Sequence, residues 1–153
     1  IILNEVDEMI TEYKCGKGNV VINLTNMKTK VKVKLKNNKP TVKLKINSKG
    51  AIQEINCNKN LEKNTTIKEI EKSAEKSLKK QIEKGIKLAQ KKYKTDIFGF
   101  GNLFYKKYPQ YYKKVNENWN EKTFPEIDIK IDTNINLMTK GSIEKSLLGG
   151  IHE

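Results

Sequence analysis

One short stretch of the chain carries the residue types of a ligand-binding loop. It runs from Asp96 to Gly101 with the sequence DIFGFG, so a carboxylate precedes two closely spaced glycines. Glycine-rich loops cradle phosphates when they follow a strand and open a helix. Here the third glycine is missing and the preceding residues favour a helix, so a nucleotide site is not expected. We expect the glycines to allow a tight turn, and Asp96 to cap the helix beginning near Phe100 or to brace that turn.

Other groups that perform acid–base, nucleophilic or metal chemistry are sparse. His152, the single histidine, stands next to the last residue, where neither a rigid catalytic constellation nor a soft-metal site is expected. Among the carboxylates, Asp128 and Asp132 share a strand face, for which a salt-bridging role is the simpler interpretation. The sequence therefore predicts no enzyme, no metal site and no cofactor.

The two cysteines, Cys15 and Cys57, permit one disulfide but do not require it. Neither has a metal-ligand neighbour, and the chain contains no C-x-x-C pair. We expect both residues to be free thiols.

Residues 93–124 contain ten of the eleven aromatic residues of the chain. Lysines alternate with tyrosines near Pro109, which is a pattern that suits stacking on single-stranded nucleic acid. Such a segment more often forms two short helices that are broken at the proline, with the rings buried and the lysines exposed. We favour that second interpretation, in which the segment builds the core.

Lysine supplies all 31 basic residues, and the formal net charge is +13. Basic proteins often bind nucleic acid, yet the strongest base and phosphate contacts use the planar arginine fork. The codon bias of an AT-rich genome explains the composition most simply, and a nearby anionic membrane or wall is the next interpretation. No apolar run approaches the ~20 residues of a membrane helix. The apolar start at Ile1 looks like a cut inside a longer protein.

Alternation with a period of two predicts strands in the first third of the chain. Lysines at 28, 30, 32, 34 and 36 alternate with less polar side chains, and the alternation resumes at 42–47 after a polar break. This predicts a hairpin with one apolar face and one lysine face. We also expect a strand at 20–24, a bulge or bend at 48–50 and an extension of the second strand at 51–56. Residues 4–14 are expected to form a short amphipathic helix.

The longest predicted element is an amphipathic helix from Ile67 to about Lys92, with apolar residues spaced by three and four. Thr66 and Glu69 are expected to form a capping box at its start. Beside the apolar stripe runs a ladder of lysines at a spacing of four: Lys68, Lys72, Lys76, Lys80 and Lys84. A solvated face is the simpler interpretation of this ladder, and a surface facing anionic lipid is the alternative.

The last alternating segment, at 126–137, carries acids where the earlier strands carry lysines. Like charges that lie opposite one another cost stability. We therefore expect this strand to pair beside a lysine strand, so that acids lie next to lysines. Residues 1–141 are expected to form one domain that ends with a turn at Lys140-Gly141, and residues 142–153 a weakly structured tail.

The order of these motifs resembles the C-terminal domain of the Ger(x)C family, the lipoprotein C subunits of bacterial spore germinant receptors. The residues that carry the resemblance, together with Tyr108, are Asp96, Phe98, Gly99, Phe100, Gly101, Pro109, Trp119, Phe124 and Gly141. The similarity extends back to about Leu3 and so covers nearly the whole chain. Tyr112 departs from the family pattern, because members often carry a second tryptophan there.

The resemblance implies an α+β domain in which an antiparallel sheet of about four strands carries one long amphipathic helix and shorter helices on its apolar face. It implies a lipoprotein anchored at the outer face of the spore inner membrane through a lipid-bearing cysteine upstream of this chain. It also implies action beside membrane-embedded A and B subunits in nutrient detection, with no catalytic residue. No small-molecule ligand is predicted, because the sequence itself shows no polar pocket. The competing hypothesis is a basic nucleic-acid-binding module.

Overall fold

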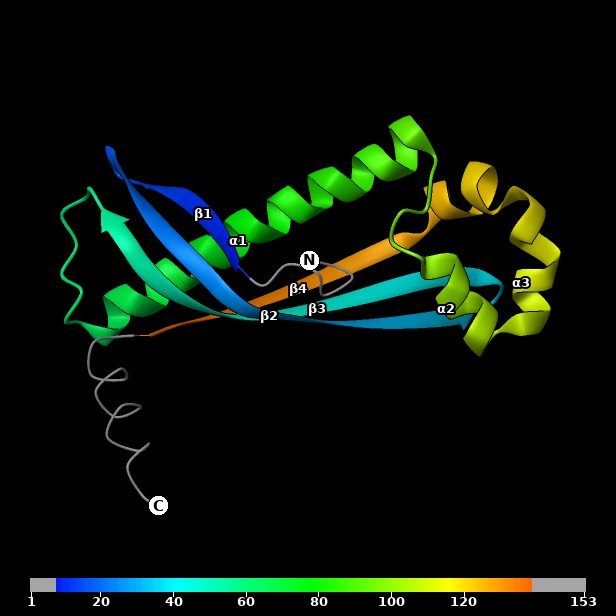
Figure 1. Cartoon of the computed structure of the whole chain (residues 1–153), viewed down its shortest axis with the longest axis horizontal. Coiled ribbons are helices and arrows are strands. Elements are labelled where there is room, and N and C mark those ends of the chain that lie inside the picture. Colours follow the sequence, from blue (N-terminus) through cyan, green and yellow to red (C-terminus); the bar gives the residue numbers. More distant parts are fainter. Residues whose placement is uncertain (1–7, 139–153) are drawn as a thin grey trace, which may run out of the picture.

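The framework of the molecule is a four-stranded sheet in the order β1-β2-β3-β4 (Figure 1). The computed structural model describes residues 8–138. The strands are β1 (Glu8–Cys15), β2 (Gly18–Lys36), β3 (Lys39–Ile55) and β4 (Asp128–Leu137). The first three pair antiparallel, whereas β4 runs parallel to β3. The predicted α+β class with about four strands is confirmed, but the sheet is mixed and not wholly antiparallel. The chain passes through a long helical segment between β3 and β4, which is the kind of crossover that parallel pairing requires.

The hairpin of β2 and β3 closes with a two-residue turn at Asn37-Asn38. Both asparagines have positive φ, at 50° and 59°, as a type I′ turn requires. The lysines of β2 are exposed, whereas Val42, Leu44 and Ile46 of β3 are buried. The predicted hairpin with one apolar face and one lysine face is confirmed.

A β-bulge interrupts β2 at Asn26, which has a φ of 52°. The register shifts between Thr25 and Lys28, so β2 holds one more residue than β3 at this point. Both Leu24 and Met27 are therefore buried, although they are three residues apart, because the extra residue reverses the alternation. The irregularity predicted at 48–50 lies on the neighbouring strand instead, and β3 continues through it. Figure 1 shows both strands curving beyond this point.

The helix predicted at 4–14 is wrong for the residues that the structure describes. Residues 8–15 form β1, which pairs with residues 18–25 of β2 across a tight turn at Gly16-Lys17. Met9 and Tyr13 are four residues apart, a spacing that fits one side of a strand as well as one side of a helix. Ile10, which a helix would have buried, is 69% exposed.

The prediction of free thiols is also wrong, because Cys15 and Cys57 form a disulfide with their Cα atoms 6.0 Å apart. Cys15 ends β1, and Cys57 follows β3. The backbone amide of Asn56 donates a hydrogen bond to the carbonyl of Asn19 at 2.9 Å, which holds the two segments together. A separation of 42 residues in sequence gives no sign of this closeness, which follows from the strand pairing.

The long helix α1 (Asn64–Lys87) continues into a π-helical segment, η1 (Leu88–Tyr93). Its buried side chains recur every four residues at Thr66, Ile70, Ala74, Leu78, Ile82 and Ile86. This confirms the predicted helix. The capping box is wrong, because α1 begins at Asn64 and Thr66 is buried within the first turn. Glu69 instead accepts a hydrogen bond from Lys59 in the preceding loop, at 2.6 Å.

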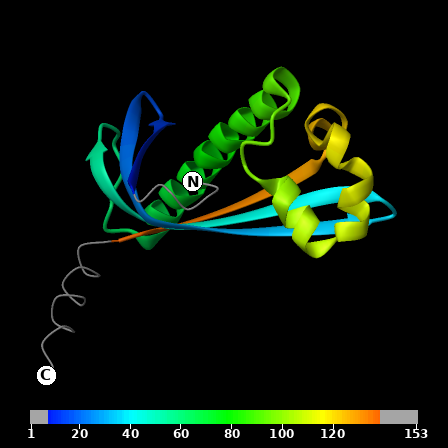
Figure 2. The ribbon, with the colours of Figure 1, turned by 45° about the vertical axis from the view of Figure 1, so that its right-hand side comes forward.

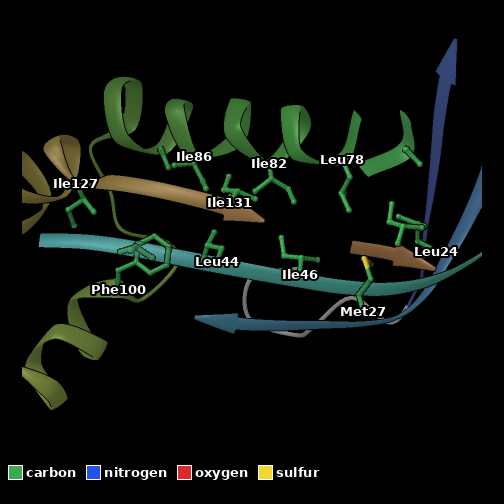
Figure 3. Packing of buried hydrophobic residues seen from close by; sticks show 14 of the residues in the cluster. Leu24, Met27, Leu44, Ile46, Leu78, Ile82, Ile86, Phe100, Ile127 and Ile131 are labelled. Carbon is green, nitrogen blue, oxygen red and sulfur yellow. The ribbon is translucent and has the colours of Figure 1, made fainter. Parts of the chain in front are cut away.

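The core lies between α1 and the apolar face of the sheet. Figure 3 shows side chains of α1, such as Leu78 and Ile82, pointing towards Ile131 of β4 and Leu44 and Ile46 of β3. The acidic strand β4 lies beside the lysine strand β3, as predicted, and Lys43 Nζ is 2.7 Å from Asp132 Oδ2.

The outer edge of β4 is bonded to glutamates of α1. Ile135 donates its backbone N–H to Glu75 Oε1, and Leu137 donates to Glu71 Oε1, both at 2.9 Å. The hydroxyl of Thr133 donates to the carbonyl of Glu75 at 3.1 Å. These bonds fix the helix along the strand.

Shorter helices cover the other end of the sheet, near the β2–β3 turn (Figure 2). They are α2 (Phe100–Lys107), α3 (Pro109–Val115), η2 (Asn116–Asn118), η3 (Trp119–Thr123) and η4 (Phe124–Glu126). The predicted pair of helices broken at Pro109 is confirmed. Gly141, the turn predicted at Lys140-Gly141, the tail predicted at 142–153 and His152 lie outside the described residues.

Candidate functional site

Asp96 joins the turn before α2 to the helical segment that follows α3. Its Oδ1 accepts a hydrogen bond from the backbone N–H of Phe100 at 3.1 Å. Its Oδ2 accepts from the N–H of Gly101 at 2.7 Å and from the indole Nε1 of Trp119 at 2.9 Å. The backbone N–H of Asp96 donates in turn to Asn120 Oδ1 at 2.9 Å. One carboxylate thus caps the start of α2 and positions the tryptophan.

The two glycines of the DIFGFG stretch have different physical roles. Gly99 has a φ of 70°, in the left-handed region that glycine adopts without strain. At Gly101, a Cβ would lie 2.9 Å from Trp119 Nε1 and 3.0 Å from the Tyr112 hydroxyl. The position that a phosphate would occupy in a phosphate-binding loop is filled here by the Asp96 carboxylate. The stretch therefore forms a structural turn.

Around this turn the aromatic rings form a continuous buried cluster. Phe100, Phe104 and Phe124 are fully buried, and Trp119 is almost so. The ring centroids of Trp119 lie 5.5 Å from those of Phe104 and 5.3 Å from those of Tyr112, within the range of favourable aromatic contacts. Phe98 is half-buried, with its ring 5.3 Å from that of Phe100. Figure 3 shows Phe100 beside Leu44 of β3.

Gln90 is a positioning residue that the sequence did not reveal. It is 7% exposed, and its Nε2 donates to the carbonyls of Phe124 at 2.8 Å and Ile127 at 3.0 Å. Lys91 beside it pairs with Glu126 at 2.8 Å. Together they join the end of the long helix to the start of β4. The sequence offered one sign of this role, which is that an amide side chain directly follows Ala89 at the end of the apolar stripe of the helix.

A shallow groove of about 660 Å³ lies between α3 and the β2–β3 turn. Its walls include Leu35, Tyr108, Pro109 and Tyr111, and Lys114 stands beside them. Burial raises the pKa of Tyr111 above its ordinary value. The groove was not predicted, because it joins the turn at the end of β2 to a helix more than seventy residues later.

The predicted lysine ladder is exposed along the whole of α1. Lys68, Lys72, Lys76, Lys80 and Lys84 each stand two residues after a buried residue of the helix. Two residues turn an α-helix by about 200°. The ladder therefore points away from the sheet, and the Asp96 turn and the ladder do not form one site.

Within residues 8–138, no group of three or more His, Cys, Asp or Glu side chains has the arrangement of a metal site. In the same part of the chain, no helix is both long enough and apolar enough to cross a membrane. Most tyrosine rings of the aromatic segment pack inward, although Tyr93 and Tyr105 are 64% and 59% exposed.

Comparison with known proteins gives consistent matches. The profile of the family described as "Spore germination B3/ GerAC like, C-terminal" matches residues 1–141. Spore germination protein KC of Bacillus subtilis (strain 168) is 30% identical over 138 residues, which are 88% of this chain and 34% of that protein. Spore germination protein B3 of the same organism is 28% identical over 127 residues, covering 82% of this chain and 34% of that protein. The chain thus spans about a third of the length of these curated relatives.

The crystal structure of the GerBC protein has the same fold. It matches 90% of this chain and 43% of that chain with a TM-score of 0.79, at 22% sequence identity. The family match extends over nearly the whole chain and includes the aromatic segment. The chain therefore belongs to the spore germination B3/GerAC-like C-terminal family, the C-terminal domain of the Ger(x)C germinant-receptor subunits that the sequence predicted.

Proposed function

We propose that this domain is a non-enzymatic part of a germinant-receptor C subunit that acts through protein–protein contact in nutrient-triggered germination. The observation that carries the proposal is the family match over residues 1–141. The partners we propose are the membrane-embedded A and B subunits of the same receptor.

The hydrogen bonds of the Asp96 carboxylate support a structural role for the family-motif residues. Both of its carboxylate oxygens accept hydrogen bonds from groups of the fold. A general acid or base must instead reach a substrate proton. We propose that the motif residues Asp96, Phe98, Gly99, Phe100, Gly101, Pro109, Trp119 and Phe124 keep the helical end in one shape, so that its surface fits a partner.

We further propose that the domain lies at the outer face of the spore inner membrane, where a lipid anchor upstream of this chain would hold it. The charge of the chain supports a position beside anionic lipid, because Lys and Arg side chains are attracted to such surfaces. The ladder from Lys68 to Lys84 is exposed and available for such a contact.

Germination of spores tests the proposed function. Replacing Trp119 or Asp96 by alanine in the full-length subunit should abolish the response to the nutrient, while the response to a receptor-independent trigger is retained. The amount of subunit in the inner membrane shows whether a variant protein is still present. Its co-purification with the A and B subunits shows whether the contact is kept. Nutrient responses that stay normal in both variants and in a strain without the domain contradict the proposal.

The alternative of a nucleic-acid-binding module gains no support from the family match or from the relatives. Stacking on bases needs accessible rings. Of the tyrosines that alternate with lysines, Tyr108, Tyr111 and Tyr112 pack against the core, whereas Tyr105 is 59% exposed.

A further inference from the structure

The polar side of the sheet presents a second lysine surface, which we call the lysine face. It consists of the exposed residues Lys28, Lys30, Lys32, Lys34 and Lys36 of β2, Lys43 and Lys45 of β3, and Lys130 of β4. The strand register aligns them in rows, such as Lys32–Lys43–Lys130. Three lysines are therefore adjacent on one side of three strands that lie about 4.8 Å apart.

The negative charge on this face is too small to balance it. Two aspartates, Asp128 and Asp132, share the face with the eight lysines. Asp132 is paired with Lys43 at 2.7 Å, and this hydrogen bond and charge lower the pKa of the aspartate below its ordinary value. Asp128 aligns with Thr41, and Thr41 aligns with Lys34. These eight lysines and two aspartates leave an excess of six positive charges, to which Lys39 and Lys49, exposed on the same side of β3, add. Like charges on neighbouring strands repel one another.

The lysine face and the ladder of α1 point in opposite directions. The ladder projects from the side of α1 that faces away from the sheet, and the lysine face lies on the side of the sheet that is not packed against α1. A flat anionic surface can therefore meet only one of them.

The chemistry of the rows indicates what kind of surface would cover the lysine face. Among the described residues, the aligned positions hold only Lys, Asn, Thr and Asp. The cores of protein–protein interfaces are enriched in aromatic residues and arginine and depleted in lysine. Binding of single-stranded nucleic acid relies on stacked rings, which these rows do not contain. A lysine ammonium is a compact point charge without a preferred planar partner. The lysine face therefore matches a surface on which many negative groups are spread out, without a fixed geometry.

We propose that the lysine face is the surface by which this domain docks on anionic phospholipid bilayers, with the ladder of α1 turned away from the lipid. Residues 28–36 extend about 30 Å along the strand, so that many lipid headgroups contact the face at once. This proposal does not depend on the receptor function, because the chain alone would show the binding.

Vesicle sedimentation tests the proposal. The unaltered chain is mixed with vesicles of phosphatidylglycerol and phosphatidylcholine in equal parts, and with vesicles of phosphatidylcholine alone. Each lysine near an anionic surface contributes about fivefold to partitioning. Binding should occur only with the anionic vesicles. It should disappear when the salt concentration rises from about 0.1 M to about 1 M, which shortens the Debye length from ~10 Å to ~3 Å.

Two variants with the same change of charge locate the binding surface. The sheet variant replaces Lys30, Lys32, Lys34 and Lys45 by glutamine, and the ladder variant replaces Lys68, Lys72, Lys76 and Lys80 by glutamine. We expect the sheet variant to lose about 100-fold or more in partitioning and the ladder variant to change by less than about threefold, because only side chains near the lipid contribute. Circular dichroism confirms that each variant is folded.

A footprint on the unaltered chain gives an independent measurement that does not depend on the folding of a variant. Lysine acetylation in the presence of anionic vesicles, read by mass spectrometry, should be slowed at Lys32 and Lys43 and unchanged at Lys76. The proposal is overturned if the ladder is protected instead, or if the ladder variant is the one that loses binding. It is also overturned if the chain ignores anionic vesicles, or if it binds a single-stranded oligonucleotide more tightly than the vesicles at equal ionic strength.

Discussion

At the scale of single residues, two polar side chains hold the helical end of the domain in place. Asp96 accepts hydrogen bonds from Phe100, Gly101 and Trp119, and Gln90 donates to two carbonyls at the start of β4. Each links segments that are distant in sequence. Losing either one leaves donors or acceptors unsatisfied in a part of the molecule with little water, which costs more than the bond itself contributes.

Asp96→Asn tests this account of the turn. An amide offers one acceptor oxygen in place of two, so at least one of the three N–H donors loses its partner. We expect the free energy of unfolding to fall by about 2–3 kcal/mol, measured by denaturant titration. The matched control is Asp128→Asn, an exposed carboxylate whose loss should change stability by less than about 0.5 kcal/mol. Equal effects of the two substitutions contradict the assigned role.

The buried hydroxyl of Tyr13 should make the stability of the domain fall at alkaline pH. Burial, and secondarily the charge of Glu69, raises the pKa of Tyr13 to about 12. Its hydroxyl has no hydrogen-bond partner among the described residues. Because the folded-state pKa is raised above the unfolded value of about 10, the stability contributed by neutral Tyr13 is complete below pH 10. It is lost as the pH rises through 12.

Tyr13→Phe should therefore remove part of the loss of stability between about pH 10 and pH 12. At neutral pH the variant should be as stable as the unaltered chain, or more stable by up to about 1 kcal/mol, because no hydroxyl is left buried without a partner. Denaturant titrations at pH 8 and pH 11 measure both effects. If the variant loses as much stability between pH 8 and pH 11 as the unaltered chain, the titration of lysines alone causes that loss.

At the scale of elements, the two longest periodic patterns were predicted correctly, whereas the local capping box at Thr66 was not. The lysine alternation of β2 and the four-residue spacing of α1 reflect the periods of strand and helix, which are local properties. The segment that became β1 was misread because Met9 and Tyr13 satisfy both periods. Its strand character comes from pairing with β2, so the deciding interaction lies outside the segment.

The features that the sequence did not reveal depend on distant parts of the chain meeting. The disulfide between Cys15 and Cys57, the parallel pairing of β4, the groove beside Tyr111 and the bonds of Gln90 all join such parts. The three bonds to Asp96 are an intermediate case. A cap on the start of α2 was expected from the DIFGFG stretch, but the bond to Trp119 required the whole helical end.

The disulfide between Cys15 and Cys57 should contribute strongly to stability. It links residues 42 positions apart, and closing a loop of that size in the unfolded chain corresponds to about 4 kcal/mol in the chain-entropy account. The double variant Cys15→Ala/Cys57→Ala should unfold at lower denaturant concentration, with a loss of about 2–4 kcal/mol. The control is the unaltered chain with and without a reductant. A reductant that leaves its stability unchanged contradicts this expectation.

At the scale of the whole molecule, the charge is divided between two opposite surfaces. The ladder of α1 lies on one side, and the lysine face of the sheet lies on the other. The chain corresponds to about a third of its curated relatives, so the orientation of this domain determines which surface the rest of such a protein can reach. The docking proposed above would leave the ladder accessible to the rest of such a protein.

The two glutamates along β4 also have a consequence for the behaviour of the molecule in solution. An open strand edge is a template on which another copy can pair, which leads to aggregation. Glu71 and Glu75 occupy the backbone donors of Leu137 and Ile135 on that edge. The helix therefore protects the sheet from polymerisation at this strand.

Removing both carboxylates should expose the edge. Glu71→Ala/Glu75→Ala is expected to lose about 3–6 kcal/mol of stability, since the two bonds go to charged acceptors and each is worth about 1.5–3 kcal/mol. It should also form oligomers whose size grows with concentration in analytical ultracentrifugation. The matched pair Glu71→Gln/Glu75→Gln keeps an acceptor oxygen at each position and should remain monodisperse. The membrane position proposed above would concentrate neighbouring copies, and under that condition the two carboxylates would keep the copies from forming fibres.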